Sequence, residues 1–350
     1  MARIEEIDTN LAVKTEIKKE NIVFLNANNR AFSLYGVFYE NGMYRRMPEG
    51  VAKSVSEGVH FLHANTAGGR IRFKTDSPYI AINVKYGYIT RLPHFSLTGT
   101  ASFDIYVDEK YHGTFVPPKN IIDSYEGLLE LGDRREREIT LNFPLYSEVK
   151  ELYIGLDGAS FIQPPKKYTQ EKPFVFYGSS ITQGGCASRP GMAYPSLVCR
   201  RLNANHINLG FSGSARAEDE ISEYISKLDM SIFVYDYDHN APSFEHLAAT
   251  HEKMFKKIRE QNPDLPIVFM SVTSMPRFRD NPEKRKEIIF ATYQNAKATG
   301  DNNVYFIDGE EIRTAYDNEG AVEGVHPSDL GFYFIANAVQ KVLENIIKKQ

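Results

Sequence analysis

A serine and a histidine at two distant points of the chain have the residue types and neighbours that nucleophilic catalysis needs. Ser180 follows the apolar run 174–177, where we expect a strand to give way to a helix, and Gly178 permits the sharp turn. His326 lies three residues after Glu323. A carboxylate beside a histidine can hold its tautomer and stabilise the imidazolium, which suits a general base. The pattern therefore predicts a serine nucleophile activated by a histidine.

Each of these residues, taken alone, also has an ordinary structural explanation. The segment does not fit the G-x-S-x-G elbow of α/β-hydrolases, because Thr182 stands at the position of the second glycine. Ser180 could instead be part of a polar turn or a helix N-cap. His326 could be a surface-loop histidine. Asp308, at the end of a predicted strand, is a second candidate for the acid, although a turn-capping role suits its position better.

Hydrogen-bond donors follow two further predicted strands. The segment Asn208-Leu-Gly210-Phe-Ser-Gly213 has two glycines that permit close backbone approach and an exposed N–H, and Asn240 carries a side-chain amide. In doubly wound sheets the carboxyl ends of the strands meet at one edge, where ligands bind. We therefore expect Ser180, these donors and the acid–histidine pair to converge at that edge.

The segment before Asn240 also carries side chains of metal-ligand type, namely Asp236, Asp238 and His239. All three lie on one segment of alternating direction, and they lack a ligand partner elsewhere in the sequence. We interpret them as a hydrogen-bonding scaffold. The sequence predicts neither a metal nor another cofactor.

The second half of the chain alternates between short apolar strands and helical stretches. Strands are expected at 174–177, 206–209, 231–235, 266–270 and 303–307, and helices near 191–203, 217–227, 244–262, 283–299 and 330–348. Continuous apolar strands that alternate with helices indicate a parallel sheet covered on both faces. The predicted fold class of this half is a three-layer α/β domain with five parallel strands.

The first half of the chain shows short alternating segments, turn residues and almost no helical period. Strands are expected at 21–25, 32–39, 70–74, 79–86, 102–108, 138–143 and 151–156. Many short strands at this spacing predict an antiparallel β-sandwich. Because the composition of 163–173 is typical of a linker, we place a sandwich domain at 1–168 and an α/β domain at 169–350.

Composition and charge exclude several other classes of protein. The 350 residues are 42% apolar and 25% charged, which is typical of folded globular chains and not of disordered or low-complexity ones. Lys plus Arg (41) against Asp plus Glu (45) leaves a net charge of −4. Neither nucleic acid nor an anionic membrane is therefore an expected partner.

The N-terminal residues and the number of cysteines bear on the cellular compartment of the protein. The first residues lack the basic start and apolar run of a secretory signal, and no window reaches the ~20 apolar residues of a membrane span. Cys186 and Cys199 are too few for a disulfide framework, and their spacing matches no common zinc motif. We expect a cytoplasmic protein in which both thiols serve packing.

Four motifs together resemble the sequence blocks of the SGNH (GDSL-type) hydrolases, in the order of that family. They are Gly178-Ser-Ser180-Ile-Thr182, Asn208-x-Gly-x-x-Gly213, Asn240 and Glu323-x-x-His326. The longer string from Gly178 to Tyr194 resembles a two-domain esterase subgroup with an N-terminal jelly-roll-like domain. The G-x-D-L-Y element of that subgroup has a counterpart in Ser102-Phe-Asp104-Ile-Tyr106. The resemblance implies a three-layer, flavodoxin-like SGNH hydrolase domain preceded by a jelly-roll-like sandwich.

The resemblance also implies a role for each matching residue. The family's nucleophile falls on Ser180 and its base on His326. The oxyanion donors fall on the N–H of Ser180, the N–H of Gly213 and the amide of Asn240. Glu323 replaces the family's aspartate three residues before the histidine and is one methylene longer. The site could therefore work as a triad, or as a dyad completed by a backbone carbonyl.

The implied activity is that of a serine esterase that hydrolyses short-chain esters, above all O-acetyl groups of carbohydrates, through an acyl-enzyme. Its expected partner is a small-molecule or oligosaccharide ester, and Arg189, Tyr194 and Arg216 are candidates for contacting a polar acyl acceptor. An acyltransferase with the same Ser–His site is the first alternative. A non-catalytic glycan-binding protein is the second, although the chain lacks the tryptophan that often forms sugar platforms. The oligomeric state is left open.

Overall fold

The computed structural model describes residues 13–278 and 280–349, which divide into two compact units. The first unit contains the chain up to Arg46, Ala64–Lys167 and Arg189–Gly191, and the second contains Met47–His63, Tyr168–Ser188 and the chain from Met192 onwards. A single boundary after residue 168 was predicted. In the structure, residues 47–63 belong to the second unit although they precede that boundary, and residues 189–191 belong to the first unit although they follow it. The prediction that a secretory signal is absent was based on the first residues of the chain. These lie outside the residues that the structure describes.

Eight strands of the first unit form a jelly roll. They are β1 (Ile22–Asn26), β5 (Arg70–Thr75), β6 (Tyr79–Ile89), β7 (Phe103–Val107), β8 (Lys110–Phe115), β9 (Ser124–Glu130), β10 (Arg137–Asn142) and β11 (Ser147–Asp157). The pairing is antiparallel and nested: β1 pairs with β11, β5 with β10, β6 with β9, and β7 with β8. This pairing gives two sheets with the paths β1-β11-β6-β9 and β5-β10-β7-β8. Two facing Greek keys of this kind define a jelly roll, so the predicted sandwich is confirmed.

Shorter elements complete this unit. They are β2 (Ser33–Tyr35) and β12 (Ile162–Gln163), which pair with β5, the hairpin of β3 (Phe38–Glu40) and β4 (Met43–Arg45), and helix α3 (Leu97–Ala101). Apolar side chains of the two sheets form the core, and those of Ile139 and Leu141 alternate along β10 with less buried neighbours. No strand was predicted at β8 and β9, or at the short β4 and β12. β8 and β9 are edge strands, whose exposed polar residues weaken the alternation.

The second unit contains a five-stranded parallel sheet in the described part of the chain. Its strands are β13 (Gln170–Gly178), β14 (Ala204–Gly210), β15 (Ile232–Asp236), β16 (Ile267–Met270) and β17 (Val304–Ile307), in the order β14-β13-β15-β16-β17. Each overlaps a predicted strand. Residues 174–177 of β13 are at most 1% exposed, because helices cover both faces of the sheet.

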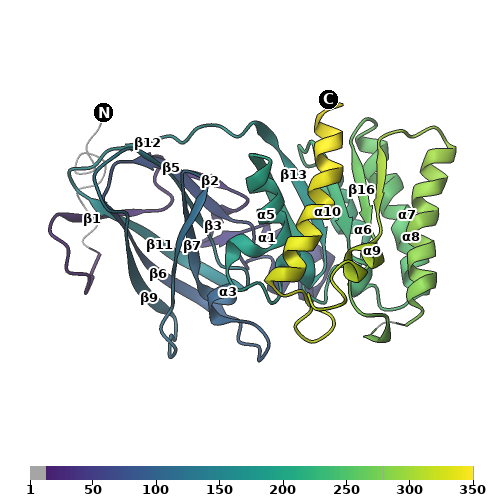
Figure 1. Ribbon diagram of the computed structural model, residues 1–350, viewed down its shortest axis with the longest axis horizontal. Coiled ribbons are helices and arrows are strands. Elements are labelled where there is room, and N and C mark those ends of the chain that lie inside the picture. The colour runs from purple at the N-terminus through teal and green to yellow at the C-terminus, as the bar shows by residue number, and fades with distance from the viewer. Residues whose placement is uncertain (1–12, 279, 350) are drawn as a thin grey trace. The chain divides into compact units, whose positions relative to one another are not determined.

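Helices form a layer on each face of this sheet (Figure 1). One layer contains α5 (Tyr194–Arg201) and α10 (Asp329–Ile347), which pack together. The other is a row of three helices, α6 (Asp219–Ser226), α7 (Phe244–Gln261) and α8 (Pro282–Ala298). Two further helices, α4 (Ser180–Gln183) and α9 (Gly309–Thr314), are short. The chain runs from β13 outwards to β14 and then returns past β13 to β15. Because parallel crossovers are right-handed, this reversal changes the face on which the helix lies. It creates a switch point beside β13, where flavodoxin-like sheets bind their ligands. The predicted α/β fold is confirmed.

Two helices from the first half of the chain, α1 (Glu49–Val55) and α2 (Glu57–Leu62), belong to the second unit. Met47, Ala52, Val59 and Leu62 join its apolar core. The sequence analysis expected almost no helix in this half. Ser56, which caps α2 by accepting a bond from the Val59 N–H at 3.2 Å, is the local signal that it did not use.

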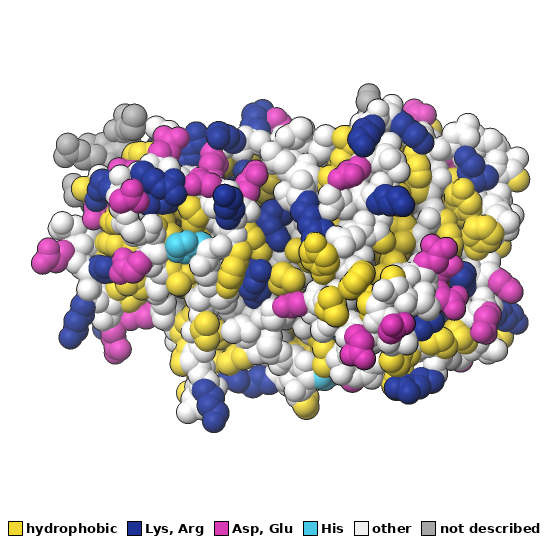
Figure 2. Space-filling model, in the orientation of Figure 1, with side chains coloured by type: hydrophobic (Ala, Val, Ile, Leu, Met, Phe, Trp, Pro, Cys, Tyr) yellow, Lys and Arg dark blue, Asp and Glu magenta, His cyan; other side chains and the backbone are white. Residues whose placement is uncertain are grey.

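The surface carries both signs of charge. In Figure 2, dark-blue basic and magenta acidic side chains are interspersed over the face that is shown, in keeping with the net charge of −4. Among the helices of the described residues, none is long and apolar enough to cross a membrane.

Candidate active site

The turn that carries Ser180 is tightly packed. β13 ends at Gly178, and a Cβ there would lie 2.1 Å from the Asp236 carbonyl oxygen and 2.2 Å from Thr182 Oγ1, so only glycine fits. Ser179 then caps α4 by accepting a bond from the second N–H of that helix at 3.1 Å. Ser180 is therefore presented as the first residue of a helix, just beyond the carboxyl edge of the sheet.

Ser180, His326 and Glu323 form one chain of hydrogen bonds. Ser180 Oγ lies 2.8 Å from His326 Nε2, and His326 Nδ1 bonds Glu323 Oε1. A carboxylate only accepts hydrogen bonds, so Nδ1 carries the proton and Nε2 is left to accept from the serine hydroxyl. The longer side chain of Glu323 thus reaches the imidazole, and the hydrogen-bond pattern is that of a triad.

The loop that carries the acid and the histidine closes on itself. The Val322 N–H donates to the His326 carbonyl at 2.8 Å, and Ala321 and Pro327 form an antiparallel bridge. Glu323 Oε2 accepts from the N–H groups of Val325 and His326, both at 2.9 Å. The acid is therefore fixed by backbone donors of its own loop.

These contacts set the charge of the acid. Partial burial by itself would raise the pKa of Glu323, but bonds from the His326 side chain and from the N–H groups of His326 and Val325 outweigh it and lower that pKa to about 2. Glu323 is therefore ionised at neutral pH, as stabilisation of an imidazolium requires.

The two other predicted oxyanion donors, Gly213 and Asn240, lie together. β13, β14 and β15 end level with one another, because Gly178 is in register with both Gly210 and Asp236. We assign the Asn240 amide from its neighbours: Nδ2 donates to the Phe211 carbonyl at 3.0 Å, and Oδ1 accepts from the Gly213 N–H at 3.3 Å. An amide nitrogen has two hydrogens, so Asn240 has a second one to donate.

Tyr194 differs from its predicted role. Its side chain is fully buried, and its hydroxyl lies 3.2 Å from Thr182 Oγ1. Burial raises its pKa well above the ordinary value, with the nearby Asp236 carboxyl adding to the effect. Tyr194 therefore supports the helix that carries Ser180, and a fully buried ring cannot contact an acyl acceptor.

Arg189 belongs to the first unit, where it is held by the sandwich. Its Nη1 donates to Asp104 Oδ2 at 2.7 Å and to the Tyr106 hydroxyl at 2.6 Å, and its guanidinium lies 3.8 Å from the ring centroid of Tyr111. Asp104 also accepts from the Gly191 N–H at 2.8 Å. The sequence analysis proposed a substrate contact for Arg189, but in the structure its guanidinium binds the D and Y of the G-x-D-L-Y-like element.

Arg216, the third candidate for acceptor binding, is exposed. Its Nη2 donates only a long bond of 3.4 Å to the Gly213 carbonyl. Its guanidinium thus lies next to the segment that carries a predicted oxyanion donor. A contact between Arg216 and an acyl acceptor stays a prediction.

The acidic residues near Asn240 are bound by protein groups. Asp236 Oδ2 accepts from Thr182 Oγ1 at 3.1 Å, and Asp238 forms a fully buried ion pair with Arg285 at 3.1 Å. His239 is also buried. Burial raises the pKa of Asp236 well above its ordinary value, and the charge of Asp238 adds to the rise. These contacts are those of a hydrogen-bonding scaffold.

Asp308, the second candidate for the acid, has a different role. It is the N-cap of α9, where it accepts from the Glu310 N–H at 2.9 Å, and it pairs with Lys286. The hydrogen-bond partner of the His326 imidazole is instead Glu323.

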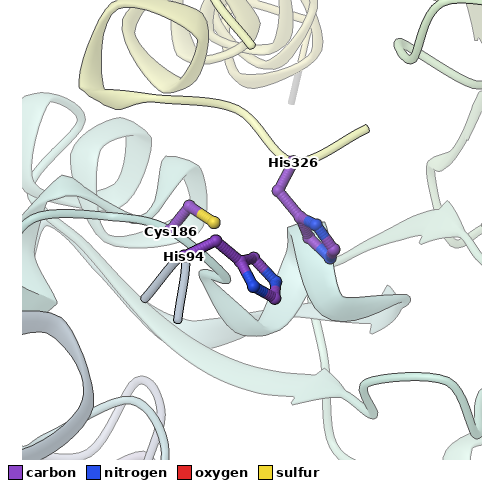
Figure 3. A group of neighbouring side chains, drawn as sticks. All are labelled: His94, Cys186 and His326. Atoms are coloured by element: carbon purple, nitrogen blue, oxygen red, sulfur yellow. The ribbon is translucent and has the colours of Figure 1, made fainter. Parts of the chain in front are cut away.

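Cys186 lies on the loop after α4, and Figure 3 shows it together with His326, whose ring extends from the loop before α10 toward the ribbon of α4. His94, also labelled there, belongs to the first unit. Burial, with a contribution from the charge of Glu323, raises the pKa of Cys186 to about 12. The thiol therefore stays protonated at neutral pH and is a poor nucleophile. Cys199 is buried as well, and both cysteines are free.

Comparison with protein families gives the same assignment as the geometry. Residues 171–344 match the GDSL-like Lipase/Acylhydrolase family, and residues 22–162 match GxDLY, the N-terminus of SGNH-hydrolase-type esterases. The chain belongs to the SGNH hydrolases. Membership in this family makes it an esterase or acylhydrolase by class. No curated relative matches the chain in sequence.

Several solved structures share this two-domain architecture. A candidate GDSL-like lipase from Bacteroides ovatus ATCC 8483 is 28% identical, with a TM-score of 0.85 over 94% of this chain and 98% of that one. The salicylyl-acyltransferase SsfX3 from a tetracycline biosynthetic pathway is 19% identical, with a TM-score of 0.76 over 94% and 98%. A family two carbohydrate esterase from Clostridium thermocellum is 14% identical, with a TM-score of 0.62 over 93% and 99%. The last two show a common fold.

Two residues that support this SGNH site were given no role of their own in the sequence analysis, although Asn208 stands in one of its motifs. Asn208 Nδ2 donates to the Thr182 carbonyl at 2.7 Å, and its Oδ1 accepts from the Gly210 N–H at 2.9 Å. Gln183 Oε1 accepts from the Ser212 N–H at 3.0 Å. A buried amide near the end of an apolar strand, two residues before Gly210, was the visible signal for Asn208.

Proposed function

We propose that this protein is a serine esterase that removes short acyl groups, chiefly acetyl, from the hydroxyls of carbohydrates. The observation that carries the proposal is the unbroken hydrogen-bond chain from Ser180 Oγ through the imidazole of His326 to Glu323. An ordinary serine hydroxyl is a weak nucleophile at neutral pH, and an adjacent base oriented by an acid is the usual means of activating it.

In the proposed mechanism each residue of this chain has its own step. His326 Nε2 takes the proton of the Ser180 hydroxyl as Oγ attacks the ester carbonyl, and Glu323 stabilises the imidazolium that forms. The same imidazolium then protonates the leaving alcohol. Water, deprotonated by His326, attacks the acyl-serine ester, and the acid product leaves as the serine recovers its proton.

The negative charge on the carbonyl oxygen needs preorganised donors. The Ser180 N–H at the start of α4, the Gly213 N–H and the second Nδ2 hydrogen of Asn240 are the groups we assign. The Gly213 N–H makes only a 3.3 Å bond to Asn240, so it can be redirected to the oxyanion at small cost. Removal of one such donor typically lowers turnover by about 100- to 1,000-fold.

The choice of a carbohydrate ester is supported by similarity in architecture. Solved structures that match this chain over 93% of its length include family two carbohydrate esterases from Clostridium thermocellum and Cellvibrio japonicus and an acetyl xylan esterase from Butyrivibrio proteoclasticus.

The proposal is tested with a short ester and a set of acetylated oligosaccharides. We expect the wild type to release acetate from both, and Ser180→Ala to lose at least about 1,000-fold in turnover, because the triad acts as a unit. Ser188→Ala is the matched control, since Ser188 binds Asp329 and lies outside the hydrogen-bond chain. Hydrolysis retained by a pure Ser180→Ala preparation would contradict the proposal.

A fluorophosphonate probe separates catalysis from binding. Labelling at Ser180 in the wild type, absent in Ser180→Ala, supports a serine hydrolase. Affinity for glycans without labelling or acetate release would instead identify a glycan-binding protein.

Acyl transfer is a second candidate function, favoured by the resemblance over most of both chains to the salicylyl-acyltransferase SsfX3. The two activities share Ser180 and His326 and differ in the acceptor of the acyl group. Product analysis in the presence of an added sugar alcohol distinguishes them. A transferred acyl ester in excess over free acid at low acceptor concentration would favour the transferase.

A further inference from the structure

Arg285 is a fully buried charged side chain in the first turn of α8. Burial of a guanidinium is costly unless its N–H groups are bound. On one side, Nε and Nη2 donate to Asp280 Oδ1 at 3.2 and 2.8 Å, and Nε also donates to the Asp280 carbonyl at 3.1 Å. The remaining donors point to the segment that follows β15.

These donors bind the backbone on both sides of Asn240. Nη1 donates to the Asp238 carbonyl at 3.2 Å and to Asp238 Oδ1 at 3.1 Å, and Nη2 donates to the Ala241 carbonyl at 3.1 Å. Residues 238–240 form a single 3-10 turn, in which the Asn240 N–H donates to the Tyr237 carbonyl at 2.8 Å. One planar group therefore holds the residues that flank the predicted oxyanion donor.

We propose that Arg285 is a positioning residue that fixes Asn240 for oxyanion stabilisation. The proposal rests on the proposed function, because it assumes that Asn240 donates to the oxyanion. A guanidinium presents its N–H groups as a rigid fork, so it can bind two carbonyls and a carboxylate at once. The Asn240 amide itself reaches across to Phe211 and Gly213 by bonds of 3.0 and 3.3 Å, so its direction depends on where the turn is held.

A lysine at this position tests the geometry without removing the charge. A single ammonium cannot hold the Asp238 and Ala241 carbonyls in the same fixed arrangement. Because a small misplacement of a catalytic group can cost a large factor in rate, we expect Arg285→Lys to lower kcat for p-nitrophenyl acetate by about 10-fold with KM little changed.

A double-mutant cycle shows whether the loss acts through Asn240. We expect Asn240→Ala to lower kcat by about 100- to 1,000-fold, and Arg285→Lys to cause less than a twofold further loss in that background. A structural role alone would lower the rate by the same factor in both backgrounds. That multiplicative result, or full kcat in Arg285→Lys, would overturn the proposal.

Arg259→Lys is the matched control. Arg259 on α7 likewise binds carbonyls with one nitrogen, at Asn262, Pro263 and Leu265, and an aspartate, Asp301, with another. Its loop precedes β16 and carries none of the proposed catalytic groups. We expect this variant to lower the melting temperature, as Arg285→Lys does, while keeping kcat within twofold of the wild type.

A second variant keeps the proposal testable if Arg285→Lys does not fold. Asp280→Asn changes a half-exposed carboxylate that orients the guanidinium from its outer side. We expect a smaller fall in kcat that also disappears in the Asn240→Ala background, and an unchanged kcat would count against the proposal. A wild type that neither hydrolyses esters nor reacts with a fluorophosphonate would instead refute the proposed function itself.

Discussion

The two sides of the active site are built in different ways. Around Ser180, the side chains of Thr182, Gln183 and Asn208 are fully buried, and their hydrogen bonds join segments that are 26 or more positions apart in the chain. Around His326, the side chains of Glu323 and His326 are 37% and 17% exposed, and the bonds that hold the acid come from residues two and three positions away. The nucleophile is placed by the packed sheet, whereas the base is placed by one short loop.

This difference determines whether a substitution on each side should lower stability, activity or both. A change beside Ser180 disturbs strand packing, so stability and activity should fall together. A change in the His326 loop removes local bonds at the surface, so activity should fall while the fold remains.

The largest effect is expected for Gly178→Ala. The new Cβ would meet the Asp236 carbonyl at 2.1 Å and Thr182 Oγ1 at 2.2 Å, so β13 and β15 would have to separate. We expect a loss of about 3 kcal/mol in the free energy of unfolding and a large loss of esterase activity. Urea unfolding followed by circular dichroism, with a parallel assay, measures both.

Gly300→Ala serves as the control for this substitution. Gly300 has a positive φ of 89° but nothing within 4 Å of its Cβ position, and it lies at the far end of α8. It should lose about 1 kcal/mol through backbone strain and keep its turnover. Wild-type stability in Gly178→Ala would show that the strand end is not as rigid as described.

The effect of Glu323→Ala should be confined to activity. We expect turnover to fall at least about 100-fold, since an uncharged partner neither orients the imidazole nor stabilises its protonated form. The melting temperature should change little, because the carboxylate is partly exposed. Glu319→Ala, which removes an exposed carboxylate four residues earlier, is the control. Turnover within fivefold of the wild type would indicate a Ser–His dyad.

The sequence predicted those features that local pattern encodes. Apolar strands that alternate with helices gave the parallel sheet and its layers, and the residues after each strand end gave Ser180, Gly213 and Asn240. His326 and Glu323 could be paired because their contact spans only three residues. In each case, the information lies within a few positions of the chain.

Features that depend on distant packing could not be predicted in the same way. Arg285 stands in the run Glu283-Lys-Arg-Lys-Glu287, which is indistinguishable from a solvated helix face until α8 is placed against the turn after β15. Arg189 and Tyr194 were close to the nucleophile in sequence, but nearness in sequence does not determine which way a side chain points. The structure uses one as an ion pair and the other as buried support.

Two carboxyl groups, one on each side of the active site, should contribute to stability with opposite dependence on pH. Burial raises the pKa of Asp236 well above its ordinary 3.8, whereas hydrogen bonds that outweigh partial burial lower the pKa of Glu323 from 4.5 to about 2. A raised pKa contributes stability that is complete below the ordinary value and declines as the pH rises toward the folded-state pKa. A lowered one contributes stability that is present above pH 4.5 and is lost as the pH falls toward about 2.

Comparison with variants that cannot titrate isolates each group. The stability of the wild type relative to Asp236→Asn should decline as the pH rises above about 4, and its stability relative to Glu323→Gln should decline as the pH falls below about 4.5. Thermal melts of the three proteins across this range measure both differences, which we expect to be a few degrees for Asp236 and about one degree for the partly exposed Glu323. If both differences moved in the same direction with pH, the two carboxyl groups would share one kind of environment, and the distinction between a buried strand-end side and a loop side would fail.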